Sequence, residues 1–110
     1  MKRNGPTPAP SEPPPAHLSE RARALWTSVV PRRALSPERL ALLQIALESL
    51  DRANSVAEII ARDGMTTTTK TTGAVHINPL LKLEYDNRQL FSKIWLGLSL
   101  GWSNEIDRGF

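Results

Sequence analysis

The chain has 110 residues, no cysteine and a formal net charge of +3 at pH 7. The absence of cysteine excludes disulfides, thiolate chemistry and cysteine-based metal sites. No window approaches the roughly 18 apolar residues that a membrane span needs, and no apolar stretch follows Lys2 and Arg3, so we expect no membrane span and no signal peptide. A chain of this size predicts one small domain with a modest core, which often gains stability from association with its own copies.

The basic residues are concentrated in the first third of the chain. Residues 1–39 hold seven Lys/Arg and three Asp/Glu, a balance of +4, whereas residues 40–110 hold seven and eight, a balance of −1. Such asymmetry suggests an anionic partner, most commonly nucleic acid. A basic arm that only aids solubility is the alternative.

Six of the nine prolines fall in residues 1–16, which predicts a disordered or polyproline-like arm. A first helix is expected from His17 to Val30, and Pro31 is expected to end it. Its apolar positions recur on one helical face. They are Leu18, Ala22, Leu25, Trp26 and Val29.

A second, longer helix is expected to begin with Ser36 as N-cap and Pro37 in the first helical position. Asp63-Gly64 is expected to end it, because glycine readily takes the left-handed conformation after a helix. Leucines recur within this helix at a coiled-coil-like spacing of three and four residues. They are Leu40, Leu43, Leu47 and Leu50. One partner helix cannot easily cover this stripe and also Leu42 and Ala46, so we expect a neighbouring subunit to cover the remainder.

The connector, residues 65–78, holds threonine at six of the seven positions 66–72. Threonine is β-branched and forms helices poorly, so this stretch is expected to be extended or a short strand. A third helix is expected from Asn78-Pro79 to a region near Gly97–Gly101, with residues 102–110 as a flexible tail. We therefore predict an all-α fold over residues 17–101, with a short first helix and two long helices in an antiparallel hairpin.

The sequence offers no constellation of catalytic residues. His17 and His76 stand far apart without ligand spacing, no Gly-rich phosphate loop occurs, and Glu84 and Asp86 face different ways on a helix. We therefore expect a non-enzymatic protein without cofactor or metal.

The remaining candidates for function are arginines and exposed apolar positions. The arginines make a plausible phosphate-binding patch near the start of the second helix, although they could instead form a solvated face. They are Arg21, Arg23, Arg32, Arg33 and Arg39. Trp26 is expected in the core and Trp95 at an interface. The expected interface between copies comprises Leu40, Leu43, Leu47, Leu50, Leu90, Ile94 and Trp95.

Residues 36–100 resemble the P27-like family of phage terminase small subunits. Three features in this order carry the resemblance: residues 59–64 (IIARDG) closing a long helix, residues 73–79 (GAVHINP) with Gly73, Asn78 and Pro79 at a turn, and residues 96–99 (LGLS) ending a helix. After the last of these, family members commonly have a proline and then an arginine, whereas this chain continues with Leu100-Gly101-Trp102.

The resemblance implies a protein that forms rings of helical subunits in the host cytoplasm. Such a ring would bind double-stranded viral DNA near the packaging start and hand it to the terminase large subunit, which carries the ATPase and nuclease. Two other hypotheses remain open at this point. One is a helical phage scaffold or adaptor without DNA affinity, and the other is a small dimeric DNA-binding regulator.

Overall fold

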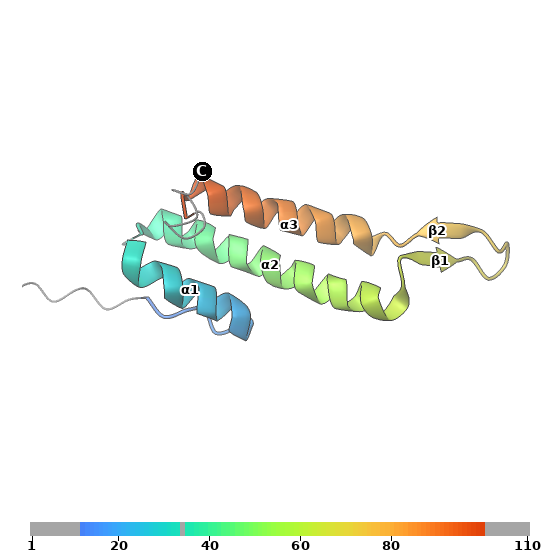
Figure 1. The fold of residues 1–110 in the computed structure, drawn as a ribbon, viewed down its shortest axis with the longest axis horizontal. Helices are drawn as coiled ribbons and strands as arrows, with labels where there is room; N and C mark the ends of the chain where they lie inside the picture. The colour runs from blue at the N-terminus through green and yellow to red at the C-terminus, as the bar shows by residue number, and fades with distance from the viewer. Residues whose placement is uncertain (1–11, 34, 101–110) are drawn as a thin grey trace, which may run out of the picture.

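The computed structural model describes residues 12–33 and 35–100, which form three helices and one two-stranded sheet. The elements are α1 (Glu20–Arg33), α2 (Pro37–Asp63), β1 (Thr66–Thr68), β2 (Val75–Ile77) and α3 (Leu80–Gly97). α2 and α3 lie side by side and antiparallel, α1 packs along one part of α2, and the two strands project from the end where α2 and α3 are joined (Figure 1). The predicted short helix and long helical hairpin are confirmed, but the all-α prediction is wrong in the connector.

The ends of α2 lie where the sequence predicts them. Ser36 has the extended conformation of an N-cap (φ −66°, ψ 163°), and its side chain accepts a hydrogen bond from the Arg39 backbone N–H at 3.3 Å. Pro37 occupies the first position, where its missing N–H costs no helical bond. Gly64 follows the helix at φ 96°, a backbone region that side chains disfavour, and its N–H donates to the Ile60 carbonyl at 2.6 Å.

Both predicted ends of α1 are wrong. The helix begins at Glu20 because Ser19 is its N-cap, with the hydroxyl accepting from the Ala22 N–H at 3.1 Å. It continues through Pro31 to Arg33. Pro31 lies in the last turn and lacks the N–H that would bond the Thr27 carbonyl, and the Arg32 Nε donates to the Ser28 carbonyl at 2.6 Å in that turn.

The threonine-rich connector forms an antiparallel β-hairpin. Thr66 pairs with Ile77, Thr67 with His76 and Thr68 with Val75. Beyond the strands the ladder continues to a bond from the Thr69 N–H to the Ala74 carbonyl at 2.8 Å, and Gly73 closes the loop at φ 73°. β-Branched side chains fit the pleated backbone of a strand, which explains why this segment is not helical.

Asn78 joins the two ends of the connector. Its side-chain nitrogen donates to the Gly64 carbonyl at 3.0 Å, and its side-chain oxygen accepts from the Leu80 N–H at 3.0 Å. Asn78 is 5% exposed. α3 begins at Leu80, so Pro79 directly precedes the helix instead of occupying its first position. The Asn-Pro turn therefore connects the end of α2 to the start of α3.

α3 ends at Gly97 in a Schellman motif with serine, not glycine, in the left-handed position. Ser99 has φ 60° and donates its N–H to the Leu96 carbonyl at 2.9 Å, while the Leu100 N–H donates to the Trp95 carbonyl at 3.3 Å. The buried side chain of Leu100 packs in the same apolar cluster as Trp95. This contact is the usual apolar companion of the motif.

The main core lies where α1, the first half of α2 and the end of α3 meet. Leu43 and Leu47 are fully buried in it, and Trp26 is 4% exposed, which confirms its predicted place in the core. The other buried members are Leu18, Ala22, Val29, Val30, Leu98 and Leu100. The Trp26 indole N–H donates to the Glu12 carbonyl at 2.9 Å, so contacts with the core begin before residue 17. The first eleven residues of the expected arm, and the whole of the expected tail, lie outside the described residues.

Small side chains line the α2 side of the hairpin beyond this core. Ala46, Ser49 and Ala53 are fully buried, and the Ser49 hydroxyl donates to the Ile45 carbonyl at 2.9 Å. The buried Asn87 of α3 likewise donates to a carbonyl of its own helix, that of Leu83, at 2.9 Å. These small or internally bonded residues let two helices approach closely without leaving a buried polar group unsatisfied.

We predict that Leu47→Ala lowers the free energy of unfolding by about 2–5 kcal/mol, because it leaves a cavity in the core. Leu42→Ala is the control, because Leu42 lies on the same helix and is 44% exposed. Urea denaturation followed by circular dichroism would measure both. Equal losses for the two variants would contradict the position of Leu47 beneath α1.

Candidate nucleic-acid interface and self-association surface

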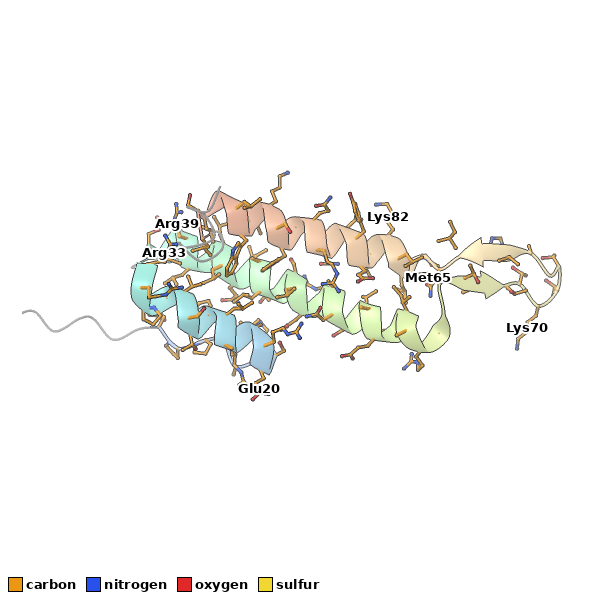
Figure 2. All side chains as sticks on the ribbon, viewed as in Figure 1. Glu20, Arg33, Arg39, Met65, Lys70 and Lys82 are labelled. Atoms are coloured by element: carbon orange, nitrogen blue, oxygen red, sulfur yellow. The ribbon has the colours of Figure 1, made fainter. Side chains whose placement is uncertain are left out.

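Three of the five candidate arginines come together at one end of the molecule. Arg32 and Arg33 close α1, and Arg39 lies in the first turn of α2, directly after the turn between the two helices. The end of α3 lies beside them, and Figure 2 shows Arg33 and Arg39 close to one another there. We call Arg32, Arg33 and Arg39 the arginine end.

Two of these arginines bind the C-terminal end of α3. Arg39 Nη2 donates to the Leu98 carbonyl at 2.7 Å, and Arg33 Nη2 donates to the Leu100 carbonyl at 3.3 Å. The C-terminal end of a helix carries partial negative charge and unpaired carbonyls, so cationic donors stabilise it. A guanidinium has five N–H groups, and each of these bonds engages one nitrogen, which leaves donors directed elsewhere.

Arg21 and Arg23 lie at the opposite end of α1. Twelve residues separate Arg21 from Arg33, which corresponds to about 18 Å along a helix. Arg21 lines a shallow groove between α1 and α2 together with Glu20, Asp51 and Glu58. The five arginines therefore fall into two groups, and Arg21 at the start of α1 shares its groove with carboxylates.

The predicted interface residues occupy different environments. Leu43 and Leu47 are fully buried within a single chain, and Leu40, Leu50, Ile94 and Trp95 are partly buried. Of the predicted set, Leu90 is the one with a large exposed fraction, 40%. Leu43 and Leu47 are buried beneath α1 within one protomer. The assignment of this set to a contact between copies therefore stays a prediction, and Leu90 is the member most available for such a contact.

Other apolar side chains of the helical hairpin are also exposed. Of these, Leu42 was expected to need cover from a neighbouring subunit, whereas Ile45 and Leu83 were not predicted as interface residues. Leu42 is 44% and Ile45 43% exposed on α2, and Leu83 is 46% exposed on α3. Leu42 and Ile45 are three residues apart, and Leu83 and Leu90 seven apart, so each pair shares one face of its helix. We call Leu42, Ile45, Leu83 and Leu90 the exposed hairpin leucines and isoleucine, after the helical hairpin of α2 and α3. The signal in the sequence was an apolar content too large for one stripe, but the periodicity alone did not show which stripe α1 covers.

The polar contacts that hold α1 against α2 were missed by the sequence reasoning. The Ser19 N–H and hydroxyl both donate to the Asp51 carboxylate, the N–H at 2.7 Å. His17 Nε2 lies 2.7 Å from Glu48 Oε2, which also accepts from Gln44 at 3.0 Å. The partners are 31 and 32 residues apart in the chain, so no local spacing indicates them.

The charges on α3 form pairs within the helix. Arg88 binds Glu84 at 2.8 Å and also donates to Asn54 of α2 at 3.2 Å, while Lys82 binds Asp86 at 2.8 Å. Across residues 12–33 and 35–100, no three or more histidines or carboxylates gather closely enough to hold a metal ion. Within the same residues, no helix has the length and apolar content to cross a bilayer.

We predict a pH-dependent contribution from Glu48. The hydrogen bonds from Gln44 and His17 lower the pKa of the Glu48 carboxyl from its ordinary 4.5. A carboxyl with a lowered pKa in the folded state stabilises the fold above its unfolded pKa, and this contribution is lost as pH falls through the lower, folded value. Glu48→Gln should therefore be less stable than the wild type at pH 7, and the difference should disappear as the solution is acidified below pH 4.5.

Urea denaturation at a series of pH values would measure this difference. Gln44→Ala and His17→Ala are the controls, because each removes one of the two hydrogen bonds and should reduce the effect of Glu48→Gln in a double-mutant cycle. A difference that stays constant down to the acid limit would rule out the carboxylate as its cause.

We also compared the chain with known proteins. No family model, no curated protein and no solved structure matches the chain.

Proposed function

We propose that this protein is a non-enzymatic, self-assembling DNA-binding protein, and that its role is the one that the P27-like resemblance implies, the small subunit of a phage terminase. In this role it binds double-stranded viral DNA in the host cytoplasm, as a homo-oligomeric ring, and recruits or regulates the large ATPase and nuclease subunit. The observation that carries the proposal is the arginine end, where two helices and the turn between them bring three arginines to one end of the molecule, two of them on carbonyls that follow α3.

The electrostatics of this end favour an anionic ligand. The negative end of the α3 dipole lies beside the positive end of the α2 dipole, so the two partly offset one another. The side chains then determine the sign of the electrostatic potential at this end. Arg32, Arg33 and Arg39 outnumber the one carboxylate of the first α2 turn, Glu38. Arginine binds phosphate oxygens through its planar fork, and phosphate contacts position a duplex without selecting its sequence.

Self-assembly multiplies this modest charge. Three arginines on one protomer hold duplex DNA weakly, whereas several copies that present them together bind with the combined avidity of all their contacts. The exposed hairpin leucines and isoleucine provide apolar surface for such assembly. Arg33 and Arg39 are held by α3, which reduces the conformational entropy that a bound phosphate would otherwise cost.

A second candidate function is a helical adaptor without DNA affinity. The bonds from Arg33 and Arg39 to α3 carbonyls favour it, because they give these arginines a structural use in the absence of any ligand. Both candidates include self-assembly, and they differ in whether a duplex binds at low salt.

We predict that Arg32→Ala combined with Arg33→Ala weakens the binding of a short duplex and lowers the slope of log affinity against log salt by about two units, one for each lost phosphate contact. The control combines Arg52→Ala with Arg62→Ala, which removes the same charge from exposed positions on α2 away from the arginine end. Fluorescence anisotropy at several salt concentrations would measure the slopes, and circular dichroism would establish that both variants are folded.

Equal slopes for the two double variants would remove the arginine end from the DNA-binding surface. A wild-type protein that assembles but binds no duplex at low salt would establish the adaptor instead.

We predict that Ile45→Asp combined with Leu90→Asp converts the assembly into smaller species, because each change places a charge on apolar surface that another copy would cover. Both side chains are partly exposed, 43% and 40%, so the protomer should stay helical. Light scattering coupled to size-exclusion chromatography would report the particle mass. A control with Arg23→Asp, a charge reversal on exposed α1 surface, should keep the wild-type mass.

A further inference from the structure

The β1–β2 hairpin has one apolar face that no described residue covers. Because directly paired residues lie on the same face of an antiparallel sheet, Ile77 and Val75 share a face with their partners Thr66 and Thr68. Ile77 is 74% exposed and Val75 68% exposed, more than any large apolar residue of the three helices. We call these four residues the apolar hairpin face.

The opposite face is polar and already has a contact of its own. Thr67 and His76 pair across it, and His76 Nε2 lies 3.1 Å from the Thr69 hydroxyl. The hairpin therefore has the alternation of a sheet that covers a core on one side, but residues 12–33 and 35–100 supply no core beneath it. Figure 1 shows the hairpin extending away from the helices instead of folding back over them.

We propose that the apolar hairpin face packs against the same face of a second copy of this chain. The two hairpins then form a two-layered, four-stranded unit, with Val75 and Ile77 of both copies between the layers. The contact is isologous, because the same surface is used on both sides, so it joins subunits in pairs, across two rings instead of around one ring. It is separate from the contact that the exposed hairpin leucines and isoleucine make on the helices.

The stability of the hairpin is the first argument for a second copy. A single two-stranded hairpin is at best marginally stable in water, and it becomes stable when further strands or a helix cover its apolar face. Stacked sheets lie about 10 Å apart, which leaves room for one layer of side chains from each. An identical hairpin supplies a matching apolar layer and two more strands.

The described residues of this chain leave the same face open. The last described residue, Leu100, packs in the core beside α1, and α2 spans about 40 Å from there to the hairpin. Val75 and Ile77 therefore stay exposed among the described residues.

The charge of the hairpin also matches a copy of itself. Between Gly64 and Leu81 the chain has one formally charged residue, Lys70, and Figure 2 shows it at the tip. One lysine is too little to select a polyanion or an acidic protein. An identical uncharged face meets the apolar hairpin face without burying any charge.

This inference rests on the self-assembly in the proposed function but not on DNA binding. The chain has no cysteine, so a single introduced cysteine can be cross-linked without reaction at any other thiol. Val75→Cys places it on the apolar hairpin face, and Thr67→Cys places it on the polar face at a similar distance from the tip. A short bismaleimide reagent should cross-link the Val75→Cys protein into covalent dimers and leave the Thr67→Cys protein mostly monomeric.

A second pair of variants measures the contribution of the same face to affinity. Val75→Thr combined with Ile77→Thr keeps β-branched residues in the strand but removes apolar surface, and it should weaken self-association at least tenfold in sedimentation experiments. Thr67→Val, on the polar face, is the matched control and should leave self-association unchanged. Circular dichroism would establish that the helices are intact in each variant.

The outcomes separate this inference from the proposed function. Selective cross-linking through Val75→Cys with weaker association of the threonine variant supports the hairpin contact, whether or not the wild-type protein binds DNA. Equal cross-linking at both positions, or unchanged association of the threonine variant in a wild type that assembles and binds DNA, overturns the hairpin contact alone. A wild type that stays monomeric overturns both the contact and the self-assembly in the proposed function.

Discussion

A helix buries one stripe, and the long hairpin of α2 and α3 has more apolar surface than the described residues cover. The start of α1 is held to the middle of α2, where the Asp51 carboxylate accepts two bonds from Ser19. Among the described residues, the part of the hairpin nearest β1 and β2 consists of α2 facing α3 without a third helix. Because nothing in the described chain covers the other flanks, Leu42, Ile45, Leu83 and Leu90 remain in contact with solvent. The length of this hairpin relative to α1 is the physical reason to expect assembly.

The structural role of the arginine end and the phosphate-binding role proposed for it need not exclude each other. Arg39 and Arg33 bind the carbonyls of Leu98 and Leu100, which directly follow α3. The same contacts hold these two guanidiniums in place. A phosphate that arrives there meets donors that are already oriented, whereas in a free arginine the orientation would have to be selected on binding.

The parts of the fold that could be predicted from the sequence depend on local chemistry. Ser36-Pro37 and Gly64 set the ends of α2 because capping, a missing N–H and a positive φ are properties of single residues. Asn78 was placed at a turn for the same reason, although α3 starts one residue later than predicted. Trp26 was placed in the core because its spacing fits the apolar face of α1.

The errors concern features that depend on residues distant in the chain. Pro31 does not end α1, because Val30 before it is buried in the core and this packing outweighs the local preference against a helix there. The position of Leu47 beneath α1 depends on how α1 packs against α2, and this packing cannot be predicted from the periodicity of α2 alone. For the candidate site, the sequence identified the arginines but not their partners, because Leu98 and Leu100 use backbone carbonyls that every residue has.

The length of α2 determines the distance between partners that bind at its two ends. About 40 Å of helix lies between the guanidiniums at its start and the hairpin after its end. A single protomer is thus a helical spacer whose two ends can be occupied at once without steric competition. A polyanion held at one extremity would stand a fixed distance from whatever the other extremity contacts, so the length of α2 sets the geometry of any larger particle.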